Sequence, residues 1–321
     1  MPNPEDDEIE TFDGSEGEIA PEPCPSWLRD LRRSNHRTGF YQALGNHALV
    51  FVDRDSANLI VSFDNLSSVR DDVVDRDPWG YGFASKFGWS HLGVMAFRPD
   101  WFRDPKLFRE MRRLADEGFF RRFRDVTLTG TSMGAYAACA FASLVPDCKV
   151  IAYSPQSTLK KKLVPWEKRF SSGRKADWSG PFADAAAEIG AAAQVWLVYD
   201  PFLEEDRIHA ERFSGKNVRF MRMRHAGHKT ALTFRRAGLL SDVTRDVVEN
   251  RMTDARFYAA YRASRRVPWF LNEVADRAAA RGRPDLIARL VLFLRRNGQG
   301  FAAHGIRKRY LVGTPDDPIQ T

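Results

Sequence analysis

Short apolar segments alternate with helical patterns through most of the chain, and this alternation restricts its fold more than any other feature. The apolar segments are rich in β-branched residues and lie at 47–53, 58–64, 91–97, 126–130, 149–155, 194–200 and 217–223. Helical patterns lie between several of them, at 105–118, 134–146 and 181–193. Strands that alternate with helices form a parallel sheet, and its buried strands are near-continuous apolar runs. The sequence therefore predicts an α/β fold, with a mostly parallel central sheet of about seven to eight strands flanked by helices.

The first two predicted strands are joined by a short polar segment, RDSA at 54–57. A polar turn of this length permits two neighbouring strands to pair as a hairpin. We therefore expect these two strands to form an antiparallel pair at the edge of the sheet.

Beyond about residue 233 the strand pattern stops and helical patterns follow. Pro268 begins a helix that Gly282 ends, and Pro284 begins another. From residue 233 to the C-terminus the chain holds 17 Lys and Arg against nine Asp and Glu. The sequence thus predicts a basic helical extension over 239–321. We expect its helices to cover an edge of the sheet; a module that docks a partner or binds nucleic acid is the alternative.

Charge is divided unevenly along the chain. The first 22 residues carry nine acids and no Lys or Arg, whereas the rest carries 33 acids against 49 bases. An acidic segment with little apolar content cannot bury enough surface to offset the entropy of ordering it. We therefore expect a disordered tail over 1–25, followed by a folded domain over 26–238. The basic remainder favours an anionic partner, although a solvated arginine-rich surface gives the same balance.

The composition also bears on the compartment. No apolar run approaches the roughly 20 residues that a membrane-spanning helix needs, and the acidic start lacks the basic and apolar regions of a secretory signal. Three cysteines (Cys24, Cys139 and Cys148) are too few for a disulfide framework, which is typical of a reducing compartment. We expect a cytoplasmic protein without a membrane span.

Motifs for metals and nucleotides are missing from the sequence. The chain has no HExxH, no CxxC and no phosphate-binding loop of the GxxxxGK[ST] kind. We therefore predict no metal, no organic cofactor and no specific nucleic-acid partner.

The sharpest local motif is Gly-Thr-Ser-Met-Gly at 130–134. It follows a predicted strand and opens an Ala-rich helical pattern, which is the context that a nucleophile elbow requires. The two glycines let strand and helix approach closely, and the turn holds the serine in a strained conformation. Ser132 is therefore the candidate nucleophile, at the carboxyl end of the sheet and at the N-terminus of a helix whose dipole favours negative charge.

With this motif the chain resembles the α/β-hydrolase family over roughly residues 45–235. The resemblance implies an esterase- or lipase-like triad in the chain order Ser, then Asp or Glu, then His. Asp206, in an Asp-Arg-Ile segment after the sixth predicted strand, matches the family's acid, and Asp200 is the fallback. His228, in Ala-Gly-His after the last predicted strand, matches the base, and His225 is the fallback. In such a triad the histidine takes the serine proton, and the acid orients the imidazole.

The resemblance further implies an oxyanion hole made of backbone N–H groups. Met133 would supply one donor, and Asp64 or Asn65, directly after the second predicted strand, would supply the other. Lipases and esterases usually carry a His-Gly pair there, so this chain departs from the family pattern. An Asp side chain beside a developing oxyanion would repel it unless the carboxylate points away or is paired.

An aromatic stretch between two predicted strands supplies candidate substrate-binding residues. It lies at 77–83 and contributes Trp79, Tyr81 and Phe83. Aromatic loops near a pocket bind apolar or sugar substrates, while packing against the sheet is the structural alternative.

The segment at 156–180 lies where this family often carries a lid, so we expect a lid there. It contributes Gln156 and Trp166 as further substrate-binding candidates and contains three consecutive lysines, Lys160–Lys162. A basic lid would suit an anionic substrate, whereas a solvated loop is the alternative.

Together these features predict a serine hydrolase that cleaves a small-molecule carboxylic ester or thioester through an acyl-enzyme intermediate. An acyltransferase would use the same triad, with an alcohol in place of water. A binding or scaffold protein that keeps the fold without catalysis is a further alternative. The acyl chain, the leaving group and the oligomeric state stay open.

Overall fold

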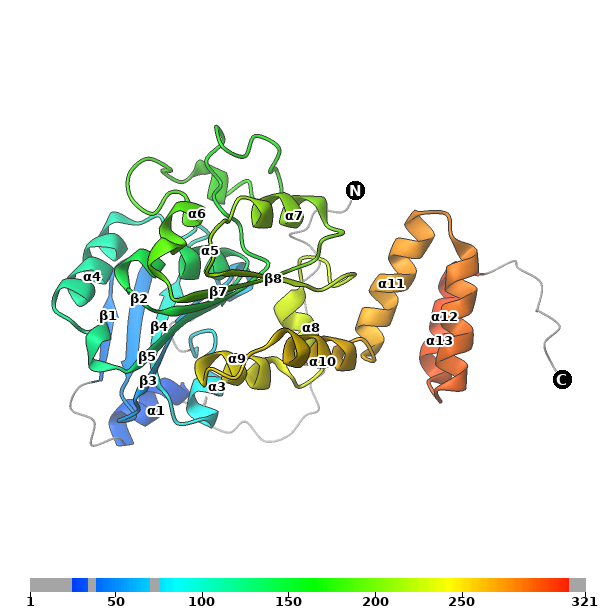
Figure 1. The fold of residues 1–321 in the computed structure, drawn as a ribbon, viewed down its shortest axis with the longest axis horizontal. Helices are drawn as coiled ribbons and strands as arrows, with labels where there is room; N and C mark the ends of the chain where they lie inside the picture. The colour runs from blue at the N-terminus through cyan, green and yellow to red at the C-terminus, as the bar shows by residue number, and fades with distance from the viewer. Residues whose placement is uncertain (1–24, 34–38, 70–75, 312–321) are drawn as a thin grey trace, which may run out of the picture.

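The computed structural model describes residues 25–33, 39–69 and 76–311, and the predicted acidic tail lies outside them apart from Pro25. Within these residues one eight-stranded sheet forms the centre of the molecule, with helices on both faces (Figure 1). The strands are β1 (Phe40–Ala43), β2 (His47–Val52), β3 (Asn58–Phe63), β4 (Ser90–Ala96), β5 (Asp125–Thr131), β6 (Lys149–Tyr153), β7 (Gln194–Tyr199) and β8 (Val218–Arg222).

Helices connect most of the strands and continue beyond the last one. The helical pattern predicted at 181–193 corresponds in the structure to the short helix α6, followed by a 3-10 turn at Ile189–Ala191. The helices are α1 (Ser26–Arg33), α2 (Leu66–Val69), α3 (Tyr81–Lys86), α4 (Pro105–Asp116), α5 (Met133–Ala140), α6 (Ala185–Glu188), α7 (Glu204–Glu211), α8 (Thr230–Arg236), α9 (Leu240–Val248), α10 (Asp254–Ser264), α11 (Pro268–Ala280), α12 (Pro284–Arg296) and α13 (Gly300–Tyr310).

The sheet confirms the predicted fold class. Its strands lie in the order β1-β2-β4-β3-β5-β6-β7-β8, and β3 to β8 all run parallel to one another. Only β2 runs in the opposite direction, since it pairs antiparallel with both β1 and β4. All seven predicted strands are present. β1 gives no comparable sequence pattern because it is four residues long and alternates between half-buried and exposed positions.

The expected hairpin between the first two predicted strands is wrong. β4 lies between them, paired antiparallel with β2 and parallel with β3. All but the first residue of β3 is buried, and two strand neighbours, β4 and β5, enclose it in the sheet. The polar segment at 54–57 therefore crosses the start of β4, where Arg54 hydrogen-bonds to the side chain of Ser90 and the carbonyl of Trp89.

Two layers of helices cover the sheet. α4, α5 and α6 lie on one face, over a core that includes Met111 of α4 and Ala137 of α5. α8, α9 and α10 cover the other face near β6 to β8, where Phe234 of α8 and Phe257 of α10 pack together. Both layers leave the carboxyl edge of the parallel strands free for the loops that follow them.

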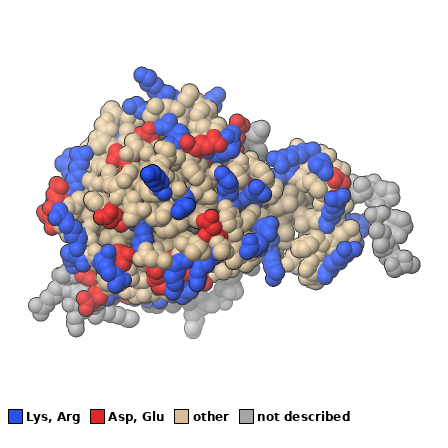
Figure 2. All heavy atoms as spheres, in the orientation of Figure 1, with Lys and Arg blue, Asp and Glu red and all other residues tan. Residues whose placement is uncertain are grey.

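The C-terminal helices cover the sheet only in part. α9 and α10 pack on it, whereas α12 and α13 project from the α/β body and pack against each other (Figure 1). α11 joins the two parts, because Phe270 lies in the core with α10 while Leu271 and Ala275 face α12 and α13. On the face seen in Figure 2, Lys and Arg outnumber Asp and Glu on the projecting helices. No helix among the described residues has both the length and the apolar character required to cross a bilayer.

The start of α5 lies against the end of β3 with no room for a side chain between them. A Cβ on Gly134 would overlap the carbonyl oxygen of Phe63, and a Cβ on Gly130 would overlap the Gly134 backbone. Only glycine therefore fits at both positions without a steric clash, as the sequence motif predicted. The turn between β5 and α5 is fixed by this contact.

Replacing Gly134 with Ala should therefore displace α5 from β3. We expect the Gly134→Ala variant to lose about 1–3 kcal/mol of stability, the usual cost of an overpacked core. Gly82→Ala is the matched control, since a Cβ on Gly82 meets nothing within 4 Å. Thermal unfolding followed by circular dichroism measures both variants, and equal midpoints would contradict the role of this contact.

Candidate active site

Ser132 lies on the turn between β5 and α5 in a backbone conformation that non-glycine residues seldom adopt. Its φ is 51° and its ψ is −115°. The Ser132 N–H donates to the carbonyl of Tyr153 at 2.9 Å, which ties the turn to the end of β6. Strain of this kind persists only where the surroundings determine the backbone, and it is concentrated at functional sites. The turn presents the Ser132 hydroxyl at the carboxyl edge of the sheet.

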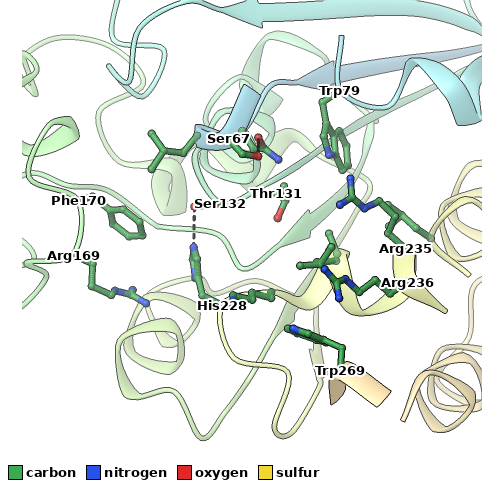
Figure 3. A pocket seen from close by; sticks show the side chains of 16 residues that line it. Ser67, Trp79, Thr131, Ser132, Arg169, Phe170, His228, Arg235, Arg236 and Trp269 are labelled. Atoms are coloured by element: carbon green, nitrogen blue, oxygen red, sulfur yellow. Dashed lines mark hydrogen bonds between the residues drawn. The ribbon is translucent and has the colours of Figure 1, made fainter. Parts of the chain in front are cut away.

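Ser132, His228 and Asp206 form a continuous hydrogen-bonded chain. His228 lies in the loop after β8, and its Nε2 is 2.8 Å from Ser132 Oγ, as the dashed line in Figure 3 marks. Its Nδ1 is 2.9 Å from both carboxylate oxygens of Asp206, which lies in the first turn of α7. The structure thus brings together the three residues that the sequence proposed, in the hydrogen-bonding order expected of nucleophile, base and acid.

Asp206 keeps its charge although it is buried. Burial raises the pKa of its carboxyl group, but the neighbouring His228 and the Arg169 guanidinium outweigh burial and hold that pKa below its usual range. Arg169 Nη1 donates to Asp206 Oδ1 at 2.9 Å. An ionised carboxylate at this point fixes a proton on Nδ1 and leaves Nε2 to accept one.

Arg169 belongs to a buried polar network that the sequence analysis missed. Its guanidinium also pairs with Glu167, which is fully buried and lies 3.2 Å from His209 Nε2. The Ser157 N–H donates to His209 Nδ1 at 3.1 Å. The segment at 156–180 has no periodic pattern, so nothing in the sequence indicated which of its charges turn inward.

A cavity of about 360 Å³ opens over Ser132 and His228. Among the predicted substrate-binding residues, only Trp79 lines it. The remaining lining residues are Asn65, Leu66, Ser67, Thr131, Ser132, Arg169, Phe170, His228, Lys229, Ala231, Leu232, Arg235, Arg236, Leu240 and Trp269.

The other aromatic candidates are packed elsewhere. Tyr81 and Phe83 are buried in α3, where Tyr81 bonds to Asp30 and Arg54 and Phe83 packs among apolar side chains. Both turn toward the sheet because α3 presents its apolar face to β4. Trp166 packs edge-to-face against the ring of His209, with 4.7 Å between the centroids.

Gln156 is fully buried next to Ser132 and His228. Its Nε2 is 3.4 Å from Ser132 Oγ and 3.4 Å from His228 Nε2. Its Oε1 accepts a hydrogen bond from Trp101 Nε1 at 3.1 Å, which sets the amide orientation. Gln156 therefore contacts the side chains of both Ser132 and His228, although it does not line the cavity.

The carboxylate of Asp64 does not face the cavity. It is fully buried, ion-paired with Arg76 at 2.5 Å, and accepts hydrogen bonds from the N–H groups of Trp79 and Ala96. This pairing removes the repulsion that an acidic residue at this position would cause. The Asp64 N–H donates to Val94 in the sheet, so it is already used.

Asn65 and Met133, the predicted oxyanion donors, follow the ends of β3 and β5. Asn65 lines the cavity, and its Oδ1 accepts from the Ser68 N–H at 2.9 Å, which caps the short helix α2. Its amide nitrogen and backbone N–H are the groups left for a ligand. Met133 is the first residue of α5, and N–H groups in a first helical turn have no partner within the helix.

Asp200, the fallback acid, holds the histidine loop in place. It is fully buried, and its Oδ2 accepts from the Gly227 N–H at 2.8 Å and pairs with Arg277 of α11 at 2.9 Å. Its other oxygen accepts from the Phe202 N–H at 2.9 Å. Asp200 thus connects the loop that carries His228 to a C-terminal helix.

His225, the fallback base, packs edge-to-face against Phe202, with 5.0 Å between the ring centroids. Burial and the nearby Arg277 lower the pKa of His225, so it is neutral at physiological pH. Its backbone φ is 67°, which turns the loop before His228.

One cluster among the described residues has the composition of a metal site. His47, Asp100 and Asp104 have potential ligand atoms within 4.8 Å of one another. His47 Nε2 is 3.2 Å from Asp100 Oδ1, and Asp104 also caps α4 by accepting from the Lys106 N–H. Ion pairing accounts for these contacts, and the prediction of no metal stays a prediction.

The pairing of His47 should make stability depend on pH. Burial lowers the pKa of His47, but hydrogen bonds to Asp100 and Asp104 outweigh burial and raise it to about 9. Since this exceeds the ordinary value near 6.5, the stabilisation is complete below pH ~6.5 and is lost as pH rises to ~9. We expect the melting temperature to fall over that interval, and to fall less in His47→Gln. Parallel curves for the two proteins would contradict this.

Comparisons with known proteins give matches among solved structures alone. No family model matches the chain, and a search of curated proteins finds no match. The chain is similar to an esterase from Pyrobaculum calidifontis (13% identity, TM-score 0.46, covering 71% of this chain and 89% of that one). It is also similar to a capsule O-acetyltransferase of Neisseria meningitidis serogroup A (11%, 0.44, covering 68% and 97%) and to Est1E from Butyrivibrio proteoclasticus (12%, 0.41, covering 69% and 99%).

The sheet topology and the turn that carries Ser132 are sufficient to assign the fold. A mostly parallel sheet is flanked by helices on both faces, and a strained Gly-x-Ser-x-Gly turn joins β5 to α5 at its carboxyl edge. The chain therefore has the α/β-hydrolase fold.

Proposed function

We propose that this protein is a serine hydrolase that cleaves a small-molecule carboxylic ester or thioester through an acyl-enzyme intermediate. The observation that carries the proposal is the chain of short hydrogen bonds from Ser132 Oγ through His228 to Asp206. A serine hydroxyl is a weak nucleophile at neutral pH and needs a base within hydrogen-bond reach. The strained turn and the cavity above it support the same assignment.

In the first half of the reaction, Ser132 Oγ bonds to the substrate carbonyl carbon while its proton passes to His228 Nε2. Asp206 stabilises the imidazolium that forms and remains ionised. The carbonyl oxygen becomes an oxyanion, which the Met133 N–H and Asn65 would bind. His228 then protonates the leaving group as its bond to the acyl carbon breaks, which leaves an ester on Ser132.

In the second half, water enters in place of the leaving group. His228 takes a proton from the water, the hydroxide attacks the acyl carbon, and the proton returns to Ser132 Oγ as the acid leaves. Product analysis with an added alcohol separates hydrolysis from acyl transfer, since an alcohol would take the place of water in this step.

Covalent labelling with a fluorophosphonate probe tests the nucleophile directly. We expect the label on Ser132, with no label in Ser132→Ala and a strong loss in His228→Ala, because the base activates the hydroxyl. His304→Ala, on the exposed side of α13, is the control. Peptide mass spectrometry locates the label. A folded protein that is never labelled, or is labelled equally in His228→Ala, would refute the mechanism.

The two candidate acids should differ in what they contribute. Asp206→Asn is expected to lower kcat for an ester by about 10⁴-fold, because the amide cannot hold the productive histidine tautomer. Asp200→Asn removes one charge-assisted contact to the loop and should cost about tenfold. Ester turnover and the melting temperature of both variants measure this difference. A larger loss in Asp200→Asn, at equal stability, would reverse the assignment.

A further inference from the structure

The cavity over Ser132 is lined by basic side chains and, among the described residues, by no acidic one. The four cations are Arg169, Lys229, Arg235 and Arg236. Arg169 is already engaged, because its guanidinium pairs with both Asp206 and Glu167. No carboxylate in the described part of the chain forms an ion pair with Lys229 or Arg235.

The basic side chains gather on one side of the nucleophile. Lys229 directly follows His228, and Arg235 and Arg236 are in the last turn of α8. Phe234 and Ala231 of that helix are buried against the sheet, so the two arginines are turned outward. In Figure 3, Arg235 and Arg236 lie on the opposite side of the Ser132–His228 pair from Phe170.

An indole ring from the C-terminal extension orders two of these cations, Lys229 and Arg236. Trp269, near the start of α11, lines the cavity. Lys229 Nζ and Arg236 Cζ each lie 5.7 Å from the centroid of its ring. Cation–π contacts and packing of the aliphatic stems restrict where the charged groups can lie. These two charges are therefore positioned beside the cavity before any ligand arrives.

We propose that the side of the cavity formed by Lys229, Arg235 and Arg236 binds a negatively charged group, a carboxylate or a phosphate, of the ester substrate. This inference rests on the proposed function and adds a substrate class to it. With the ester carbonyl at Ser132, the anionic group reaches the basic side and the remaining part contacts Phe170. Guanidinium and ammonium groups form strong charge-assisted hydrogen bonds with carboxylate and phosphate oxygens.

This assignment places the anion site away from the predicted basic lid. None of Lys160–Lys162 lines the cavity, and Lys161 and Lys162 are exposed to solvent. On this proposal the preference for anions comes from the loop that follows β8, which carries Lys229, and from α8, which carries Arg235 and Arg236.

Two matched ester pairs test the proposal. p-Nitrophenyl hemisuccinate and p-nitrophenyl butyrate differ in charge on the acyl part, whereas 4-acetoxybenzoate and 4-acetoxybenzamide differ in charge on the leaving group. We expect kcat/KM to favour the anionic member of one pair by about tenfold, equivalent to one good ionic contact. The pair that shows the preference identifies which part of the substrate faces the arginines.

Charge reversal locates the preference in the protein. Arg235→Glu should bring the ratio of kcat/KM for anionic to neutral ester below one, and Lys229→Gln should lower it severalfold. Arg219→Glu is the matched control, because Arg219 is exposed on β8 and does not line the cavity. A ratio that changes equally in Arg235→Glu and Arg219→Glu, or in neither, would overturn the proposal.

Binding to an inactive variant separates this inference from the proposed function. Calorimetry with the same esters and the Ser132→Ala variant measures the charge preference even if no ester is hydrolysed. Tighter binding of an anionic ester, lost in Ser132→Ala/Arg235→Glu, supports the anion site. Equal binding of the charged and neutral members refutes it, whatever the labelling of Ser132 shows.

Discussion

The close approach of α5 to the end of β3 is the constraint on which the rest of the site depends. Because Gly134 has no side chain, the first turn of α5 lies directly against the carbonyl of Phe63. The residue between β5 and α5 must then take an unusual backbone conformation, and this residue is Ser132. The same contact joins the ends of β3 and β5, which Asn65 and Met133 follow. A gap in packing here would separate the two strand ends.

Three buried aspartates at the carboxyl edge of the sheet are each paired with an arginine from another segment. A buried charge is costly unless it is paired and hydrogen-bonded, so each pair fixes the position of two segments at once. Their arrangement explains how irregular loops can hold Ser132, His228 and Asp206 in one hydrogen-bonded chain. The pairs are Asp64 with Arg76, Asp200 with Arg277, and Asp206 with Arg169.

Most of the fold, and the central residues of the candidate site, could be predicted from the sequence. Buried parallel strands and the Gly-x-Ser-x-Gly turn are local patterns, so they could be predicted without the structure. Strand order, in contrast, does not depend on local patterns. The segment at 54–57 has the composition of a hairpin turn, but β3 is buried, and β4 therefore lies between β2 and β3. The repulsion expected at Asp64 is absent because Arg76 forms an ion pair with its carboxylate. This pairing could not be predicted, because Arg76 lies in a different segment of the chain.

Side chains that reach the site from irregular or distant segments could not be predicted. Arg169 lies in a stretch with no periodicity, and Trp269 lies in a helix that follows the last strand by many residues. Neither position shows a motif, since each is defined only by what folds next to it. The aromatic candidates in α3 had the right composition, but the helix turns Tyr81 and Phe83 toward the sheet.

The link between Asp200 and Arg277 has a consequence for how this protein could change through evolution. A boundary drawn after the last strand would assign α11 to an accessory module, yet this helix holds the histidine loop and contributes Trp269 to the cavity wall. α11 therefore cannot be exchanged independently of the α/β body. An insertion or replacement in α11 would alter both the support of the loop that carries His228 and the wall of the cavity.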